Sequence, residues 1–200
     1  MDQFDKNPKA ILDNIKQLLS NGAKDRNHAF HTPVFSNNSD NKSINSRVVV
    51  LRKFNEEDLT LSFNTDYRSP KIIDLKKNNI SSFVFYDSKI KIQLRIKTIT
   101  SIHHNDKVTK AAWEQTRLFS RKCYLTQKAP SSITTIPEDG ISGHLKGIDP
   151  LQTESEVGYK NFTVITNLIQ EIDWLYLASS GHRRLKISFN NKTEFDWIIP

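Results

Sequence analysis

The segment 90–102 (IKIQLRIKTITSI) constrains the fold of this chain more than any other. Its isoleucine and leucine residues alternate with lysine, glutamine and arginine, so neighbouring side chains differ in polarity. Because successive side chains of an extended strand point to opposite faces, this period of two predicts a long strand with one buried face and one polar face. Such a strand requires neighbours in a sheet that covers a core.

Other segments supply those neighbours. Each is a short run of β-branched and aromatic residues bounded by turn-forming residues, which is typical of strands. We expect strands in the segments 32–35, 47–54, 59–65, 80–86, 161–166, 170–178, 184–190 and 194–199.

Helical spacing occurs in three segments, 8–19, 69–77 and 106–119. The first is amphipathic and predicts an N-terminal helix within residues 1–22, which we expect Ser20-Asn21-Gly22 to end. The second begins with Ser69 at the N-cap and Pro70 in the first turn, both of which favour a helix start.

The segments 36–46 and 126–158 are polar or proline-containing and predict loops. Many short strands with few helices, and no regular βαβ alternation, predict a mainly β, α+β fold, namely a β-barrel with added helices. We expect residues 1–200 to form one domain, in which residues 126–158 are a loop-rich insertion.

The charge and cysteine content narrow the functional classes. The 29 basic and 22 acidic residues are unevenly spread, since residues 67–128 hold 14 basic and 4 acidic side chains. This concentration favours an anionic partner, although a solvated basic surface is the simpler explanation. No apolar run approaches the length of a membrane span, and the N-terminal segment lacks an apolar signal region. With one cysteine, Cys123, we expect a cytoplasmic protein without disulfides.

Other common motifs are missing. The sequence contains no glycine-rich dinucleotide fingerprint, P-loop or serine-hydrolase elbow. Adjacent His103 and His104 point apart on a strand and have no third ligand at metal-binding spacing, so we expect no metal site.

The segment 64–71 (NTDYRSPK) carries the clearest candidate for an anion site. It follows an expected strand and opens an expected helix, whose N-terminus presents backbone N–H groups and a positive dipole end. Ser69 adds a hydroxyl, and Arg68 and Lys71 add positive charge. Phosphate binding and an ordinary capped helix with surface cations both fit this pattern.

A series of motifs extends this argument. They occur in the order RVVVLR (47–52), FNTDYRSPK (63–71), FVFYDSKIKIQLR (83–95), WEQTRLFSRKCY (113–124), GHRR (181–184) and WIIP (197–200). In order and spacing the chain resembles the pyridoxamine 5'-phosphate oxidase family. The resemblance is greatest to its shorter, related FMN-binding branch, whose members mostly lack an assigned substrate.

The resemblance implies a split β-barrel that forms a homodimer with FMN at the interface. The implied cofactor-binding residues are Arg47, Val48, Val49, Val50, Leu51, Arg52, Phe63, Asn64, Arg68, Ser69, Lys71 and Gln93. The implied substrate-binding residues are Arg52, Trp113, Arg117, Arg121 and Arg183.

The sequence also departs from the family pattern. Pro70 stands before Lys71 where the oxidases have arginine, Trp113 replaces a tyrosine, and Arg121 replaces a serine. Flavin binding therefore survives these changes better than specificity for pyridoxamine phosphate does.

The sequence leads to three functional hypotheses. The first is an FMN-dependent oxidoreductase that transfers a hydride from a small phosphorylated or otherwise anionic molecule, with pyridoxamine or pyridoxine 5'-phosphate as the named candidates. The second is a non-catalytic flavin-binding or storage protein. The third is a nucleic-acid-binding barrel that stacks bases on Phe83, Phe85 and Tyr86, although the apolar surroundings of these residues favour a core position.

Overall fold

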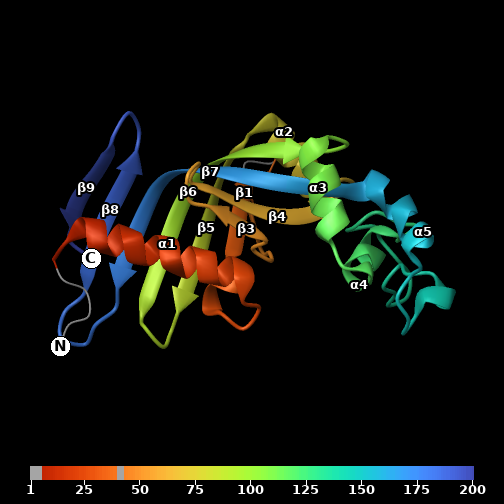
Figure 1. Ribbon diagram of the computed structural model, residues 1–200, viewed down its shortest axis with the longest axis horizontal. Coiled ribbons are helices and arrows are strands. Elements are labelled where there is room, and N and C mark those ends of the chain that lie inside the picture. The colour runs from red at the N-terminus through yellow and green to blue at the C-terminus, as the bar shows by residue number, and fades with distance from the viewer. Residues whose placement is uncertain (1–5, 40–42) are drawn as a thin grey trace.

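The computed structural model describes residues 6–39 and 43–200, which form a nine-stranded antiparallel sheet with short helices around it (Figure 1). The strands are β1 (Val34–Asn38), β2 (Ile44–Val48), β3 (Lys53–Asn55), β4 (Thr60–Asp66), β5 (Ile80–Asp87), β6 (Ile92–His103), β7 (Phe162–Tyr176), β8 (Arg183–Phe189) and β9 (Thr193–Ile198). The α-helices are α1 (Pro8–Lys24), α2 (Pro70–Lys77), α3 (Lys107–Gln115), α4 (Leu118–Arg121) and α5 (Gln152–Ser155). The 3-10 helices are η1 (Ala29–His31), η2 (Lys122–Tyr124), η3 (Gly143–Leu145) and η4 (Glu156–Asn161).

The strand order is β2-β1-β5-β6-β7-β4-β3, which leaves β2 and β3 at opposite edges. The segment 49–52 joins these two edges. Val49 N–H donates to Pro33 O (3.0 Å) beside β1, and Arg52 N–H donates to Ser62 O (2.8 Å) on β4. The sheet therefore closes into a barrel, and the expected α+β split-barrel fold is confirmed. The single strand expected over 47–54 is wrong, because this segment changes partners midway.

Strand β7 is the longest element of the sheet. It pairs with β6 along its length, with β4 through its first half and with β8 through its second half. The sequence predicts two strands here, with a break near Asn167. That break is absent because the buried Asn167 amide donates to Leu61 O (3.2 Å) and accepts from the Thr100 hydroxyl (2.8 Å). A polar residue is thereby satisfied inside the barrel.

Helix α1 lies across the sheet and buries its apolar stripe, which includes Ile11, Ile15 and Leu19, against the core (Figure 1). It continues to Lys24, so the expected stop at Ser20-Asn21-Gly22 is wrong. Gly22 serves packing instead, because a Cβ there would lie 2.8 Å from Phe30. Residues 1–5 of the expected helix lie outside the described residues.

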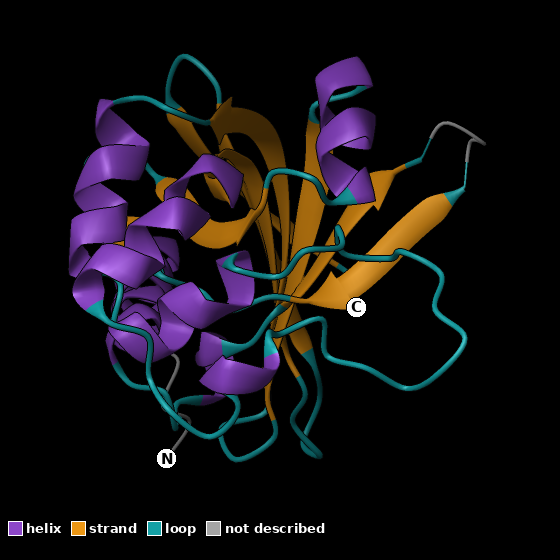
Figure 2. Cartoon of the chain, turned by 90° about the vertical axis from the view of Figure 1, so that its right-hand side faces the viewer, coloured by secondary structure: helices purple, strands orange, loops and turns teal. Residues whose placement is uncertain are grey.

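The two ends of the molecule differ (Figure 1). Helices α3, α4 and α5 gather at one end, and the β8–β9 hairpin extends at the other. From the side, most helices lie to one side of the strands (Figure 2). The helix expected over 106–119 is divided in two, because the chain leaves helical geometry at Thr116 before α4 begins. No helix of the described part of the chain has the length and apolar character of a membrane span.

Candidate functional site

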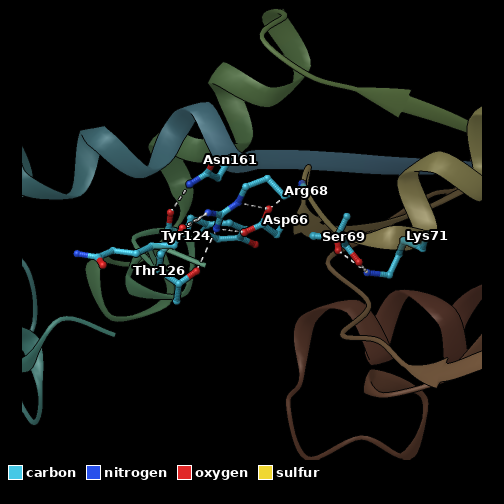
Figure 3. Close-up of polar contacts among 9 residues, drawn as sticks. Asp66, Arg68, Ser69, Lys71, Tyr124, Thr126 and Asn161 are labelled. Atoms are coloured by element: carbon cyan, nitrogen blue, oxygen red, sulfur yellow. Dashed lines mark hydrogen bonds and ion pairs between the residues drawn. The ribbon is translucent and has the colours of Figure 1, made fainter. Parts of the chain in front are cut away.

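The candidate site begins at the turn between β4 and α2. Lys71 Nζ donates to Thr65 Oγ1 (2.8 Å) at the end of β4 and to Ser69 Oγ (2.6 Å) just before the helix (Figure 3). Ser69 occupies the N-cap position, as predicted, but its side chain makes no capping hydrogen bond. The start of α2 therefore has no side-chain cap and lies beside a lysine and two hydroxyls. Of its first three residues, Pro70 has no N–H, and the Ile72 N–H donates to Ser69 O (2.9 Å).

Arg47 lies on β2, directly opposite Phe35 of β1. Its guanidinium carbon is 5.7 Å from the centre of the Phe35 ring, and its Nη1 donates to Asn37 Oδ1. Among residues 6–39 and 43–200, this is the hydrogen bond that the Arg47 guanidinium makes, and its other N–H groups can donate to a ligand.

Arg47 and Lys71 are close enough to affect one another. Burial and then the charge of Arg47 lower the pKa of Lys71 from 10.5 to about 8, while Asp66 opposes the shift. Burial also lowers the pKa of Arg47, and Asp74 opposes that shift. Two half-buried cations that disfavour each other's charge are stabilised by an anion between them. The geometry and the charge of the site therefore fit a phosphate group.

Arg68 points away from Lys71 (Figure 3). Its Nε and Nη2 donate to the buried Asp66 carboxylate (3.0 and 2.6 Å), and its Nη1 and Nη2 donate to Thr126 O (2.9 Å) and Thr126 Oγ1 (3.0 Å). The Asp66 hydrogen bond raises the pKa of Arg68 further. The contacts of Arg68 therefore join the β4–α2 turn to the start of the 126–158 segment, and we do not count it among the phosphate ligands.

The remaining predicted flavin contacts are dispersed. Val48 and Arg52 are exposed, Val49 and Leu51 are buried, and Val50 and Asn64 are half-buried in the barrel-closing segment and on β4. The Phe63 ring packs in the core against Phe35 and Phe83, so it offers a ligand only its backbone. Gln93 lies on the outer face of β6 between Tyr86 and Leu175.

The predicted substrate residues lie mostly in the helical end. Trp113 is buried against Phe162, and Arg121 is 3% exposed beneath it. The Arg121 guanidinium donates to Thr116 O, Trp113 O, Ser155 Oγ and Glu156 Oε1 at 2.6–3.1 Å. Both residues line a hollow of about 330 Å³ together with Lys110, Glu114, Gln152, Glu156 and Tyr159.

Two other arginines of the predicted substrate-binding residues do not line the hollow beside Arg121. Arg117 is exposed at the start of α4, and Arg183 is half-buried at the start of β8. None of the described contacts brings either of them to Arg47 or Lys71. The neighbouring Arg184 pairs with Asp173, which also pairs with Arg95 on β6.

The three aromatic residues of the nucleic-acid hypothesis do not form one exposed surface. Phe83 and Phe85 are each 1% exposed, so their rings belong to the core, as their apolar surroundings suggest, whereas Tyr86 is 48% exposed. His103 and His104 also have local partners, because His103 contacts Asp106 and Thr166, and His104 Nδ1 lies 3.1 Å from Phe162 O.

Sequence reasoning missed three members of the site. Thr65 was within the segment 64–71 but was not singled out, although it accepts from Lys71. Asn37 accepts from Arg47, and Asp74 accepts from Asn37; no local sequence pattern marks either residue.

A closed antiparallel barrel in which an arginine and a lysine lie close together beside a helix start fits the split-barrel class that the sequence resembles. Residues 12–104 match the family described as pyridoxamine 5'-phosphate oxidase, FMN-binding domain. The resemblance drawn from the sequence is thereby confirmed, and the expected flavin cofactor is confirmed at the level of this family.

Solved structures agree on the fold over the whole chain. A pyridoxamine 5'-phosphate oxidase-related, FMN-binding protein from Nostoc punctiforme has a TM-score of 0.73 at 18% identity, covering 99% of this chain and 100% of that one. PhzG from Burkholderia lata, solved with tetrahydrophenazine-1-carboxylic acid, has a TM-score of 0.69 at 14% identity, covering 100% and 95%. No curated protein matches the sequence.

Proposed function

We propose that residues 1–200 form one FMN-binding split-barrel domain that holds the FMN phosphate between Arg47 and Lys71. The observation that carries this proposal is the half-buried pair of cations, whose lysine is satisfied only by the Thr65 and Ser69 hydroxyls among its described partners. A phosphate dianion offsets their mutual repulsion and can accept from the Lys71 backbone N–H in the first turn of α2. The match of residues 12–104 to an FMN-binding domain supports the same ligand.

The flavin ring has a separate set of expected contacts. We propose that the backbone of residues 48–51, Asn64 and Gln93 contact the ring, because the family resemblance assigns these positions to it. Gln93 has both a donor and an acceptor on its amide, which suits the edge of a heteroaromatic ring. When bound, FMN supplies the capacity to accept a hydride.

We further propose a homodimer in which a second copy covers the outer sheet face. Val34 lies between Val48 on β2 and Val84 on β5, and the three are 36%, 63% and 36% exposed. This valine row is an apolar strip across three neighbouring strands on the face that also carries Gln93. Burial of such a strip favours association.

The proposed activity is oxidation of a small anionic molecule at the flavin, by an oxidoreductase of the cytoplasm. The basic character of residues 67–128 supports an anionic substrate. A non-catalytic flavin-binding protein is the second candidate. It is favoured by Arg121, whose guanidinium already has four protein acceptors and therefore has little capacity for a substrate anion.

The test compares FMN with riboflavin, which lacks the phosphate, in binding titrations of the wild type and of Arg47→Ala and Lys71→Ala. Each variant should weaken FMN binding by at least about tenfold, since one charge-assisted phosphate contact contributes roughly 1.5–3 kcal/mol. Riboflavin binding should stay within about twofold of the wild type in each variant, because riboflavin makes no phosphate contact. Equal FMN affinity in all three proteins contradicts the proposed site.

Turnover separates the two candidates. Oxygen uptake by the FMN-loaded protein with pyridoxamine 5'-phosphate supports the oxidoreductase. Bound FMN that is not reduced by any of a panel of anionic amines and alcohols supports the non-catalytic protein.

A further inference from the structure

We propose that Asn37 and Asp74 are positioning residues that hold the Arg47 guanidinium at the anion site through one chain of hydrogen bonds. The inference rests on the proposed function and concerns residues that do not themselves contact the ligand. Asp74 lies on α2, Asn37 on β1 and Arg47 on β2, so the chain connects three elements.

The contacts have a defined direction. Asn37 Nδ2 donates to Asp74 Oδ2 (3.3 Å) and to the backbone Asn38 O (2.8 Å). Its other amide atom, Oδ1, accepts from Arg47 Nη1. An ionised carboxylate only accepts hydrogen bonds, so Asp74 keeps the amide nitrogen of Asn37 on its own side and the amide oxygen toward Arg47.

The orientation of the Asn37 amide matters because both Asn37 and Asp74 are buried. Asn37 is 2% exposed and Asp74 is 9% exposed. If the Asn37 amide rotated by 180°, its N–H groups would face the Arg47 guanidinium. Because a guanidinium has only hydrogen-bond donors, the buried hydrogen bond between the two side chains would be lost. The guanidinium would then be free to leave the position opposite Lys71.

The position of Asp74 on its helix links the two cations. Asp74 follows Lys71 by three residues on α2, so both side chains lie on neighbouring parts of one helix face. The helix that supplies the lysine therefore also holds the support of the arginine. The negative charge of Asp74 also favours the charged form of Arg47 when no anion is present.

The experiment measures the affinity ratio of FMN to riboflavin in variants of the full chain. Asp74→Ala removes the acceptor, whereas Asp74→Asn keeps an oxygen that can accept from Asn37. We expect Asp74→Ala to weaken FMN binding by about fivefold to tenfold without changing riboflavin binding, which equals the loss of one modest hydrogen bond. Asp74→Asn should restore FMN affinity to within about twofold of the wild type, since it restores that hydrogen bond.

Two further variants keep the result interpretable. Asn37→Ser leaves a buried polar group that is too short to bridge Arg47 and Asp74, so it should lower the ratio as Asp74→Ala does. Asn45→Ala is the matched control, because the exposed Asn45 donates to the same Asp74 oxygen (3.4 Å) from β2. Its ratio should equal that of the wild type.

A purely structural role predicts a different pattern. If Asp74→Ala and Asn37→Ser weaken FMN and riboflavin equally, or leave both unchanged, the positioning role is wrong. An unchanged ratio in Arg47→Ala overturns the proposed phosphate site and this inference together. If the FMN-to-riboflavin affinity ratio falls in Arg47→Ala but not in Asp74→Ala or Asn37→Ser, the positioning role alone is overturned.

Discussion

Lys71 gives the candidate site a pH dependence at the scale of a single residue. Its pKa of about 8 means that its charge is lost as pH rises through 8, well before an exposed lysine titrates. We expect FMN affinity to fall by about tenfold between pH 7.5 and 9, while riboflavin affinity stays constant, because only the phosphate requires the ammonium. Fluorescence titration of FMN at half-unit pH steps measures this.

Lys71→Arg is the control for that pH dependence. A guanidinium stays protonated throughout this range, so the variant should bind FMN with little change from pH 7.5 to 9. An equal fall in the wild type and in Lys71→Arg would assign the pH dependence to another group.

Single residues also mark the limit of what the sequence predicts. Serine followed by proline is a sequence pattern typical of a helix start, and Lys71 comes directly after Ser69 and Pro70. This part of the site can therefore be predicted from neighbouring residues in the sequence. Arg68 carries the same charge as Lys71, and only the fold reveals that Asp66 and the 126–158 segment engage it. Asn37 lies in a segment expected to be a polar loop, yet it is buried by its contact with α2.

At the scale of elements, the packing of α1 on η1 depends on Gly22. A methyl group there would lie 2.8 Å from Phe30 Cβ and from the Phe30 carbonyl oxygen. We expect Gly22→Ala to destabilise the protein by about 1–3 kcal/mol despite the better helix propensity of alanine, because the two backbones must separate. Urea denaturation measures the change. Asn21→Ala, at an exposed neighbouring position, should differ from the wild type by less than about 0.5 kcal/mol.

The attachment of the 126–158 segment depends on Arg68. Arg68→Ala removes the hydrogen bonds to Thr126 and leaves the buried Asp66 carboxylate without its guanidinium partner. We expect faster tryptic cleavage at Lys128 and a loss of stability of about 3 kcal/mol. Cleavage at Lys24, at the end of α1, reports general unfolding. Equal acceleration at both sites would contradict a local attachment, and Arg117→Ala should change neither rate.

The sequence predicts helices and strands well where the local spacing of apolar residues determines their bounds. It predicts them poorly where a contact from outside the element determines where the element ends. The alternation in 90–102 gives β6 almost to its ends, because every second side chain enters the core. Asn167 resembles a strand end in the sequence, but partners on β4 and β6 satisfy it and β7 continues. Gly22 resembles a helix end, but α1 continues because Phe30 packs against it. For Asn167 the deciding partners lie far along the chain, and for Gly22 the deciding partner lies beyond the helix itself, eight residues later.

At the scale of the whole molecule, the valine row and the anion site lead to one joint prediction. Val34 is central to the row, so Val34→Glu introduces a charge among apolar residues on a face that a second copy is proposed to cover. The side chain is 36% exposed in one chain, so the glutamate can reach water in a monomer. The variant should therefore fold but fail to dimerise, because burying an unpaired carboxylate costs several kcal/mol.

Sedimentation velocity with detection of flavin absorbance tests both parts at once. The wild type should sediment as a dimer with FMN, and Val34→Glu as a monomer with weakened FMN binding, since the proposed cofactor position lies at the interface. Ile133→Glu, at a 97% exposed position on the 126–158 segment, is the matched control and should remain a dimer. A Val34→Glu protein that stays dimeric would exclude the valine row as the interface. A monomer that retains full FMN affinity would confine the flavin site to one chain, with Arg47 and Lys71 still able to hold its phosphate.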